Sequence, residues 1–189
     1  MIIGYSVSGD DNDSFMCSSA DEVLEDMKGL AVCPQCGYRT DFFYINRNFR
    51  VSRRVYDLSS TYDNYTIVSL KFKEFCERQG YNNIEFKGFD ADPDFFALIP
   101  LTIVEFDTDR NEPRYESYCD ECGNFESVVG PFPIYLKDIS KPLADGLYRT
   151  DLLFASGNEK SPLTIIGPKT RDAILREGFK NISFEEIIA

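Results

Sequence analysis

The stretches Cys33-Pro-Gln-Cys36-Gly37 and Cys119-Asp-Glu-Cys122-Gly123 decide how this chain folds. Two thiolates at CxxC spacing can reach one metal ion from a single tight turn, and zinc prefers four tetrahedral thiolate ligands. The glycine after each second cysteine permits a positive φ, so that the backbone can fold beneath the ion. The sequence therefore predicts one structural Zn²⁺ bound by Cys33, Cys36, Cys119 and Cys122.

The residues around the two motifs favour a pair of zinc-ribbon hairpins. Strand-like residues precede each motif, at 30–32 and 115–118, and the long segment 37–118 separates Cys36 from Cys119. This intervening segment must form an inserted subdomain, which ordinary zinc ribbons lack. Two alternatives remain. One is a redox dithiol, although such motifs normally begin a helix in a thioredoxin-like fold. The other is an iron–sulfur centre, although the usual cluster spacings differ.

A sequence repeat is the second organising feature of the chain. Residues 66–89 and 164–187 align without a gap, and eight of the 24 positions are identical. Each copy is typical of a strand, a short helix, a glycine stop and a second strand, with Gly80 and Gly178 where a helix end needs positive φ. The alternative is chance similarity between two ordinary units. Because each copy follows a CxxCG motif, we expect one zinc-stabilised domain, residues 1–189, made of two pseudo-repeated halves at about 1–105 and 106–189.

The remaining patterns predict an α+β fold. We expect mostly antiparallel strands, about three short helices, two zinc-knuckle hairpins and an internal strand-helix-strand duplication. Ser19-Ala-Asp-Glu22 matches a capping box and predicts a helix at about 19–28. Pro100 should divide the apolar run 95–106 into two strands or bend one edge strand. Further strands are expected at residues 2–8, 41–46, 113–118, 124–129 and 132–137.

The composition excludes several classes of function. A net charge of −12 disfavours general binding to phosphate backbones and suits a basic partner. The chain has no histidine, which excludes Ser-His-Asp and Cys-His catalysis and histidine-based metal hydrolysis. The sequence has no secretion signal and no apolar run long enough to span a membrane. Six cysteines in that context favour a reducing cytoplasm, and the pattern as a whole predicts a protein that is not an enzyme.

Two charged clusters are candidates for binding. Four arginines within eight residues form either an anion-binding patch or a solvated strand edge: Arg47, Arg50, Arg53 and Arg54. The partner-binding candidates are aspartates that could fit a basic site by charge complementarity: Asp90, Asp92, Asp94, Asp107 and Asp109. The run 90–94 is not followed by the glycine and glutamate of a calcium loop, so we expect a turn there.

Two cysteines lie outside the CxxC motifs. Cys76 shares an apolar helical face with Phe72 and Phe75 and is expected in the core. Cys17 lies in a polar region, and we expect it to be a surface thiol without a function.

The two CxxCG motifs are accompanied by a C-terminal pattern: Asp151-Leu-Leu, Thr164-Ile-Ile, Gly178-Phe and Ile182-Ser-Phe184. Together these features resemble the double-CxxCG-motif family of bacteria, whose known members include immunity proteins of polymorphic toxin systems. The resemblance covers most of the chain. It implies a protein that binds a cognate toxin in the cytoplasm and neutralises it. Only the four motif cysteines carry over from the family, because surfaces that contact toxins vary.

Other functions stay open beside toxin neutralisation. A zinc-ribbon module for nucleic acid or the transcription machinery would use the arginine cluster with Phe49 and Tyr56, although the acidic charge disfavours nucleic acid as a partner. An enzyme with zinc as a Lewis acid would need an open coordination position, which four cysteines do not leave. An unclassified zinc-stabilised scaffold is the remaining possibility.

Overall fold

A computed structural model describes residues 1–19, 21–25, 27 and 29–189 of the chain. The first half carries β1 (Ile2–Ser8), β2 (Leu58–Ser60), β3 (Thr66–Ser69), α1 (Leu70–Gln79), β4 (Ile84–Phe89), β5 (Asp92–Pro100) and β6 (Thr102–Val104). The second half carries α2 (Thr108–Asn111), β7 (Arg114–Cys119), β8 (Asn124–Val129), β9 (Leu147–Ser156), the 3₁₀ turn η1 (Gly157–Glu159), β10 (Ser161–Ile166), α3 (Pro168–Glu177) and β11 (Ser183–Ile188).

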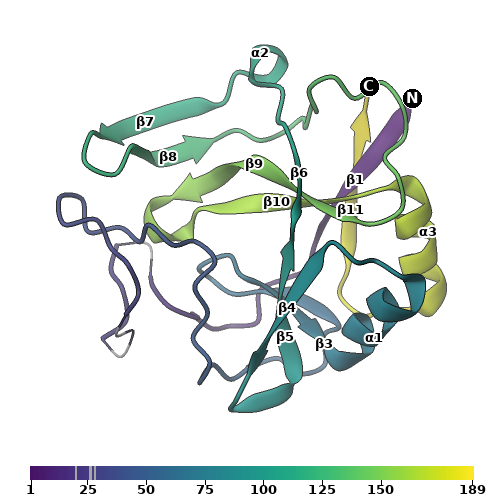
Figure 1. Cartoon of the computed structure of the whole chain (residues 1–189), viewed down its shortest axis with the longest axis horizontal. Helices are drawn as coiled ribbons and strands as arrows, with labels where there is room; N and C mark the ends of the chain where they lie inside the picture. The colour runs from purple at the N-terminus through teal and green to yellow at the C-terminus, as the bar shows by residue number, and fades with distance from the viewer. Residues whose placement is uncertain (20, 26, 28) are drawn as a thin grey trace.

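Two β-sheets make up most of the molecule (Figure 1). The larger sheet has seven strands in the order β11-β1-β10-β9-β8-β7, with β6 paired to β9 off this path. The smaller sheet has four strands in the order β2-β3-β5-β4. Neighbouring strands run antiparallel, except that β6 runs parallel to β9. The predicted α+β class is therefore confirmed, with α1, α2 and α3 as the α-helices of the described residues.

Apolar clusters pack on both faces of each sheet, because successive side chains of a strand point to opposite faces. In the smaller sheet, Val68 joins the apolar cluster beneath the helices, whereas Ile67 joins a cluster with the loops of residues 16–51. In the larger sheet, Ile166 joins the cluster beneath the helices, and Ile165 packs in a third cluster on the opposite face. The cluster that contains Val68 and Ile166 thus lies between the two sheets and below α1 and α3.

Both copies of the repeat fold as strand, helix and strand, as the sequence predicts. The first copy is β3-α1-β4 and the second is β10-α3-β11. In each copy a third strand lies between the two repeat strands and is antiparallel to both: β5 in the first and β1 in the second. Because β5 follows its copy and β1 precedes its own, the central strands lie outside the repeated sequence.

The two repeat helices begin and end as expected. Ser69 caps α1 by accepting a hydrogen bond from the backbone N–H of Phe72, and Pro168 lies in the first turn of α3. Gly80 and Gly178 end the helices with φ of 74° and 64°, in the left-handed region. The positive φ inferred from sequence is therefore confirmed at both positions.

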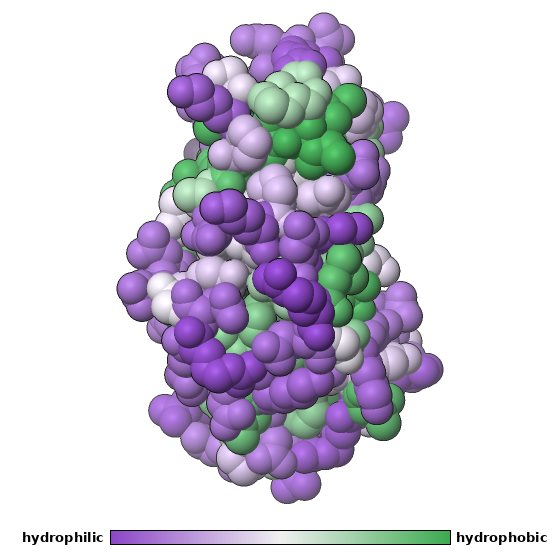
Figure 2. All heavy atoms as spheres, turned by 90° about the vertical axis from the view of Figure 1, so that its right-hand side faces the viewer, coloured by the Kyte–Doolittle hydropathy of each residue, from purple (hydrophilic) through white to green (hydrophobic). Residues whose placement is uncertain are grey.

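The helices α1 and α3 lie side by side and join the two copies in one core (Figure 1). The ring of Phe179, just after α3, lies 5.1 Å from the ring of Phe72 and 5.2 Å from that of Phe75, measured between centroids. Arg78 at the end of α1 forms an ion pair of 3.2 Å with Glu177 at the end of α3. The helix-bearing side is mainly hydrophilic, with one large hydrophobic group near the end where the termini lie and smaller groups elsewhere (Figure 2).

The helix predicted at about 19–28 is wrong for the described residues, while residues 20, 26 and 28 lie outside them. Ser19 does contact Glu22 as a capping box requires, because its Oγ accepts the backbone N–H of Glu22 at 3.3 Å. However, the backbone N–H of Ser19 also donates to the carbonyl of Glu22 at 2.8 Å, and Ser18 bridges Val23 as in a hairpin. The same side-chain contact therefore closes a tight turn.

Two of the predicted strands are also wrong. Residues 41–46 form a loop, where Phe42 and Phe43 lie against the cations Arg39 and Arg149. Residues 132–137 contribute an isolated bridge between Phe106 and Leu136 and no strand. The predicted break of the apolar run is confirmed, because β5 ends at Pro100 in one sheet and β6 belongs to the other.

The halves at about 1–105 and 106–189 are interleaved. Strand β1 lies between two strands of the second half, and β6 pairs with β9. The single-domain description stays a prediction.

Among the described residues, no helix is long and apolar enough to cross a membrane.

We expect Gly167→Ala to destabilise the protein more than Gly80→Ala. A Cβ at Gly167 would lie 2.3 Å from the backbone oxygen of Ala144, so the backbone would have to move. A Cβ at Gly80 meets open space, and only the left-handed φ opposes it. Urea unfolding should show losses of about 3 kcal/mol or more at Gly167 and about 1 kcal/mol at Gly80. Equal losses would contradict the close approach at Gly167.

Candidate metal centre

The two CxxCG motifs fold into matching turns. In the first, the N–H of Gly37 donates to the carbonyl of Cys33 at 2.9 Å, and in the second the N–H of Gly123 donates to the carbonyl of Cys119 at 2.9 Å. Both glycines have positive φ, of 76° and 69°. The first motif carries one further backbone bond, from the N–H of Cys33 to the carbonyl of Tyr38 at 2.8 Å. Glycine is needed at both positions because the chain reverses there with a left-handed conformation.

The larger sheet positions the second turn, and loops position the first. β7 ends at Cys119 and β8 begins at Asn124, so that the second motif is the hairpin turn between these strands. The first motif is closed by an isolated bridge between Val32 and Arg39. The two meet at the end of the molecule opposite α1 and α3 (Figure 1), although the whole segment 37–118 lies between them in the chain.

The four sulfur atoms lie at the spacing of a tetrahedral metal site. The Sγ atoms of Cys33 and Cys119 are 3.8 Å apart, those of Cys36 and Cys122 are 3.9 Å apart, and all four lie within 4.8 Å of one another. A tetrahedron with metal–sulfur bonds of about 2.3 Å has edges of about 3.8 Å. The cysteines that the sequence singles out are thus brought together, and they could hold one metal ion.

The surroundings of Cys36 and Cys122, the two partly exposed cysteines, shift their pKa values in opposite directions. Burial favours the neutral thiol of Cys122, but hydrogen bonds from the backbone N–H and side chain of Asn124, together with neighbouring thiols, lower its pKa to about 7. Burial and the neighbouring thiols raise the pKa of Cys36 to about 12. A metal ion that binds four thiolates therefore has to displace the proton of Cys36, while Cys122 is already partly ionised near neutral pH.

A buried polar network extends from the first motif into the protein. The side chain of Arg39 is 2% exposed, and its backbone N–H donates to Asn158 Oδ1 at 2.7 Å. Its guanidinium donates to the hydroxyl of Tyr65 and to the backbone carbonyls of Asp63 and Lys160, at 3.2 and 3.4 Å for the two carbonyls. The network ties the first motif to two loops that are distant in sequence.

The N-terminal loop joins this network through a buried carboxylate. Asp63 accepts the backbone N–H groups of Met16, Cys17 and Ser18 at 2.8, 2.8 and 3.1 Å. The hydroxyl of Tyr65 donates to the sulfur of Cys17 at 3.6 Å. Cys17 is fully buried, so the prediction of a surface thiol is wrong. The backbone N–H groups of Cys17 and of the residues on either side of it bind Asp63 instead of water.

Sequence reasoning missed Arg39, Asp63 and Lys160 as site residues. Each is a charged residue in a polar loop, which is the usual pattern of a solvated surface. Only the position of Arg39, two residues after Gly37, hinted at a role beside the metal motif. The burial of Cys76, by contrast, is confirmed on the apolar face of α1.

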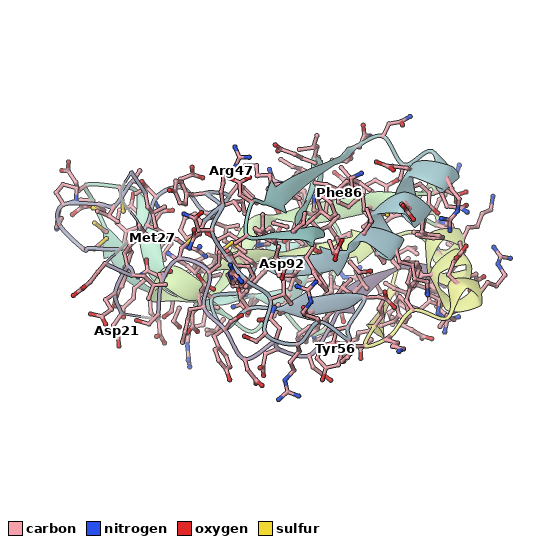
Figure 3. The ribbon with its side chains drawn as sticks, turned by 90° about the horizontal axis from the view of Figure 1, so that it is seen from below. Asp21, Met27, Arg47, Tyr56, Phe86 and Asp92 are labelled. Carbon is pink, nitrogen blue, oxygen red and sulfur yellow. The ribbon has the colours of Figure 1, made fainter. Side chains whose placement is uncertain are left out.

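The predicted arginine and aspartate clusters largely pair with each other. Arg47 forms an ion pair with Asp90 at 2.8 Å, and Arg54 pairs with both Asp92 and Asp94. Residues 47–54 form no strand, so the expected strand edge is absent there. Asp92 lies in the interior near the middle of the molecule (Figure 3), with 3% of its side chain exposed, and it also accepts the N–H of Val51. The turn expected at 90–94 covers only Asp90 and Ala91 between β4 and β5, and residues 92–94 already belong to β5.

The remaining members of the two clusters have other surroundings. Arg53 pairs with Asp13 at 2.5 Å, and Arg50 is exposed. Asp107 caps α2 by accepting the N–H groups of Asp109 and Arg110. The helix α2 lies far from the hairpin between β4 and β5 (Figure 1), so the five aspartates do not form one surface.

Comparison of the sequence with models of known protein families gives no match, and no curated protein sequence matches it significantly. The class of protein is therefore defined by structure alone. It is an α+β protein with an internal strand-helix-strand duplication and a cluster of four cysteines that could hold a metal ion.

We expect Cys17 and Cys76 to resist alkylation in the native protein. Burial raises the pKa of Cys17 to about 11 and that of Cys76 to about 12, and neither side chain is accessible. Iodoacetamide at pH 8, followed by peptide mass spectrometry, should leave both unmodified in the native state and label all six cysteines in denaturant. Rapid native labelling of Cys17 would contradict its buried position.

Proposed function

We propose that this chain is a zinc-stabilised binding protein and not an enzyme. The observation that carries this proposal is the closed cluster of four sulfur atoms, contributed by two turns that lie far apart in the chain. An ion bound there would cross-link the first loop region to the β7–β8 hairpin. Four thiolates complete the tetrahedral shell of zinc and leave no position for a substrate, which supports a structural role.

The sulfur spacing supports one zinc ion over the two alternatives. Pairs at 3.8 and 3.9 Å suit a single ion, whereas an iron–sulfur cluster requires its cysteines to be spread around several metal atoms. A redox dithiol would normally sit at the start of a helix, and both motifs here lie in turns between extended segments. Both observations favour zinc.

Metal analysis should find one zinc per chain, and chelation should loosen the protein. We expect Cys122→Ser to abolish stoichiometric zinc binding and to lower the melting temperature, because the zinc ion would lose its fourth thiolate ligand. Cys76→Ala is the matched control, since it removes a buried thiol far from the cluster and should keep one zinc per chain. The measurements are elemental analysis and calorimetry with and without a strong chelator.

A chelated wild-type protein that melts at the same temperature as the untreated one would refute a structural metal. Zinc content that survives in Cys122→Ser at full stoichiometry would equally refute the assigned ligand set.

We propose a protein toxin as the binding partner, and the cytoplasm as the place of binding. The resemblance of the CxxCG motifs and C-terminal pattern supports this partner, together with the net charge of −12. A nucleic-acid surface built on the arginine cluster has less support, because Arg47, Arg53 and Arg54 already pair with aspartates. Among the candidate aspartates, Asp109 is exposed, Asp90 and Asp94 are exposed and paired with arginines, and Asp92 is buried.

Affinity purification of the tagged protein from its native cells tests this partner. A stoichiometric toxin-like protein is expected, and co-purifying nucleic acid or transcription machinery would contradict the proposal. Once a basic toxin is found, Asp94→Lys and Asp109→Lys should each be compared with Glu186→Lys, an exposed change elsewhere in the protein. Slower association at low salt is expected for the variant whose aspartate faces the toxin. Unchanged rates for both would exclude these aspartates from the contact.

A further inference from the structure

Lys160 is a buried cation beside the four-cysteine cluster. It follows η1 and is 3% exposed, and its Nζ donates to the backbone carbonyl of Phe125. Its Nζ also lies 5.4 Å from the centroid of the Phe42 ring. Within the part of the chain that the structure describes, Lys160 forms no ion pair. A buried charge without a counter-ion is costly, so the position needs a negative group.

Lys160 shares a cavity with two cysteines of the cluster. Lys160, Phe125, Cys36 and Cys122 line this cavity of about 260 Å³ together with Glu126. Burial lowers the pKa of Lys160, an effect that Cys122, Cys36 and Glu126 oppose and to which Arg39 adds.

Arg39 is a second buried cation at this cavity. It forms no ion pair with a carboxylate in the described structure, and its guanidinium lies between the rings of Phe42 and Tyr65 at 5.3 and 4.7 Å. The nearby carboxylate of Asp63 is engaged by three backbone N–H groups instead. Arg39 also holds the backbone of Lys160 by donating to its carbonyl at 3.4 Å.

The charge of the proposed centre accounts for these cations. A divalent ion with four thiolates carries a net double negative charge, which is costly to bury unless nearby groups compensate it. We propose that Lys160 is the internal counter-cation of the metal–thiolate centre, held in place by Arg39. Lys160 is thus a positioning and charge-compensating residue that raises the affinity of the four cysteines for a divalent metal. This inference rests on the proposed zinc site.

Lys160→Met tests the role because it removes the cation and keeps a long side chain. With zinc bound, loss of the cation should weaken zinc affinity about tenfold or more, as is usual for partners beyond the ligand shell. Zinc affinity is measured by competition with a chromophoric chelator. Lys137→Met, a change at an exposed lysine, is the control and should leave zinc affinity unchanged.

Lys160→Gln separates the charge from the hydrogen bond, and it keeps a polar group if the methionine variant fails to fold. Glutamine can still donate to the carbonyl of Phe125 but is neutral, so zinc affinity should fall as in Lys160→Met. Zinc affinity equal to wild type in Lys160→Gln or in folded Lys160→Met would overturn the proposal. Wild-type protein that binds no zinc would instead overturn the proposed function itself.

Discussion

The meeting of two CxxCG turns is the constraint on which the rest of the structure depends. Four sulfur atoms within 4.8 Å would repel one another as free thiolates, and an ion bound there would convert the cluster into a cross-link. Such a cross-link would join segments that are distant in the chain and would close a long loop. The surroundings of the cluster extend beyond the cysteines, because Arg39 and Lys160 are buried against the same cavity.

The duplicated strand-helix-strand units supply the rigid body that presents these turns. Their helices share one core through Phe72, Phe75 and Phe179, at the end of the molecule opposite the sulfurs. Each unit is completed by a strand from outside the repeat: β5 from the same half in the first unit, and β1 from the other half in the second. The two halves are therefore interleaved through β1 and share one helical core.

The failures of sequence reasoning share one physical cause. Ser19 and Glu22 form the predicted capping contact, but a bridge between Ser18 and Val23 makes the segment a turn. The polar sequence around Cys17 favours a surface position, whereas Asp63 binds the backbone N–H groups of Met16, Cys17 and Ser18 in the interior. The sequence pattern reports the average preference of a residue type, and a specific hydrogen bond or bridge can override it.

The sequence by itself determined which four cysteines cluster and could hold a metal ion, together with the repeat and the helix ends at Gly80 and Gly178. These features follow from short-range chemistry: thiolate spacing in one turn, 3.6-residue periodicity and the φ that glycine permits. Only the tertiary structure decided that β1 completes the second repeat, that three arginines pair with aspartates, and that Lys160 is buried beside the cysteines. Those outcomes depend on which distant segments meet, and neither charge nor hydropathy along the chain encodes that directly.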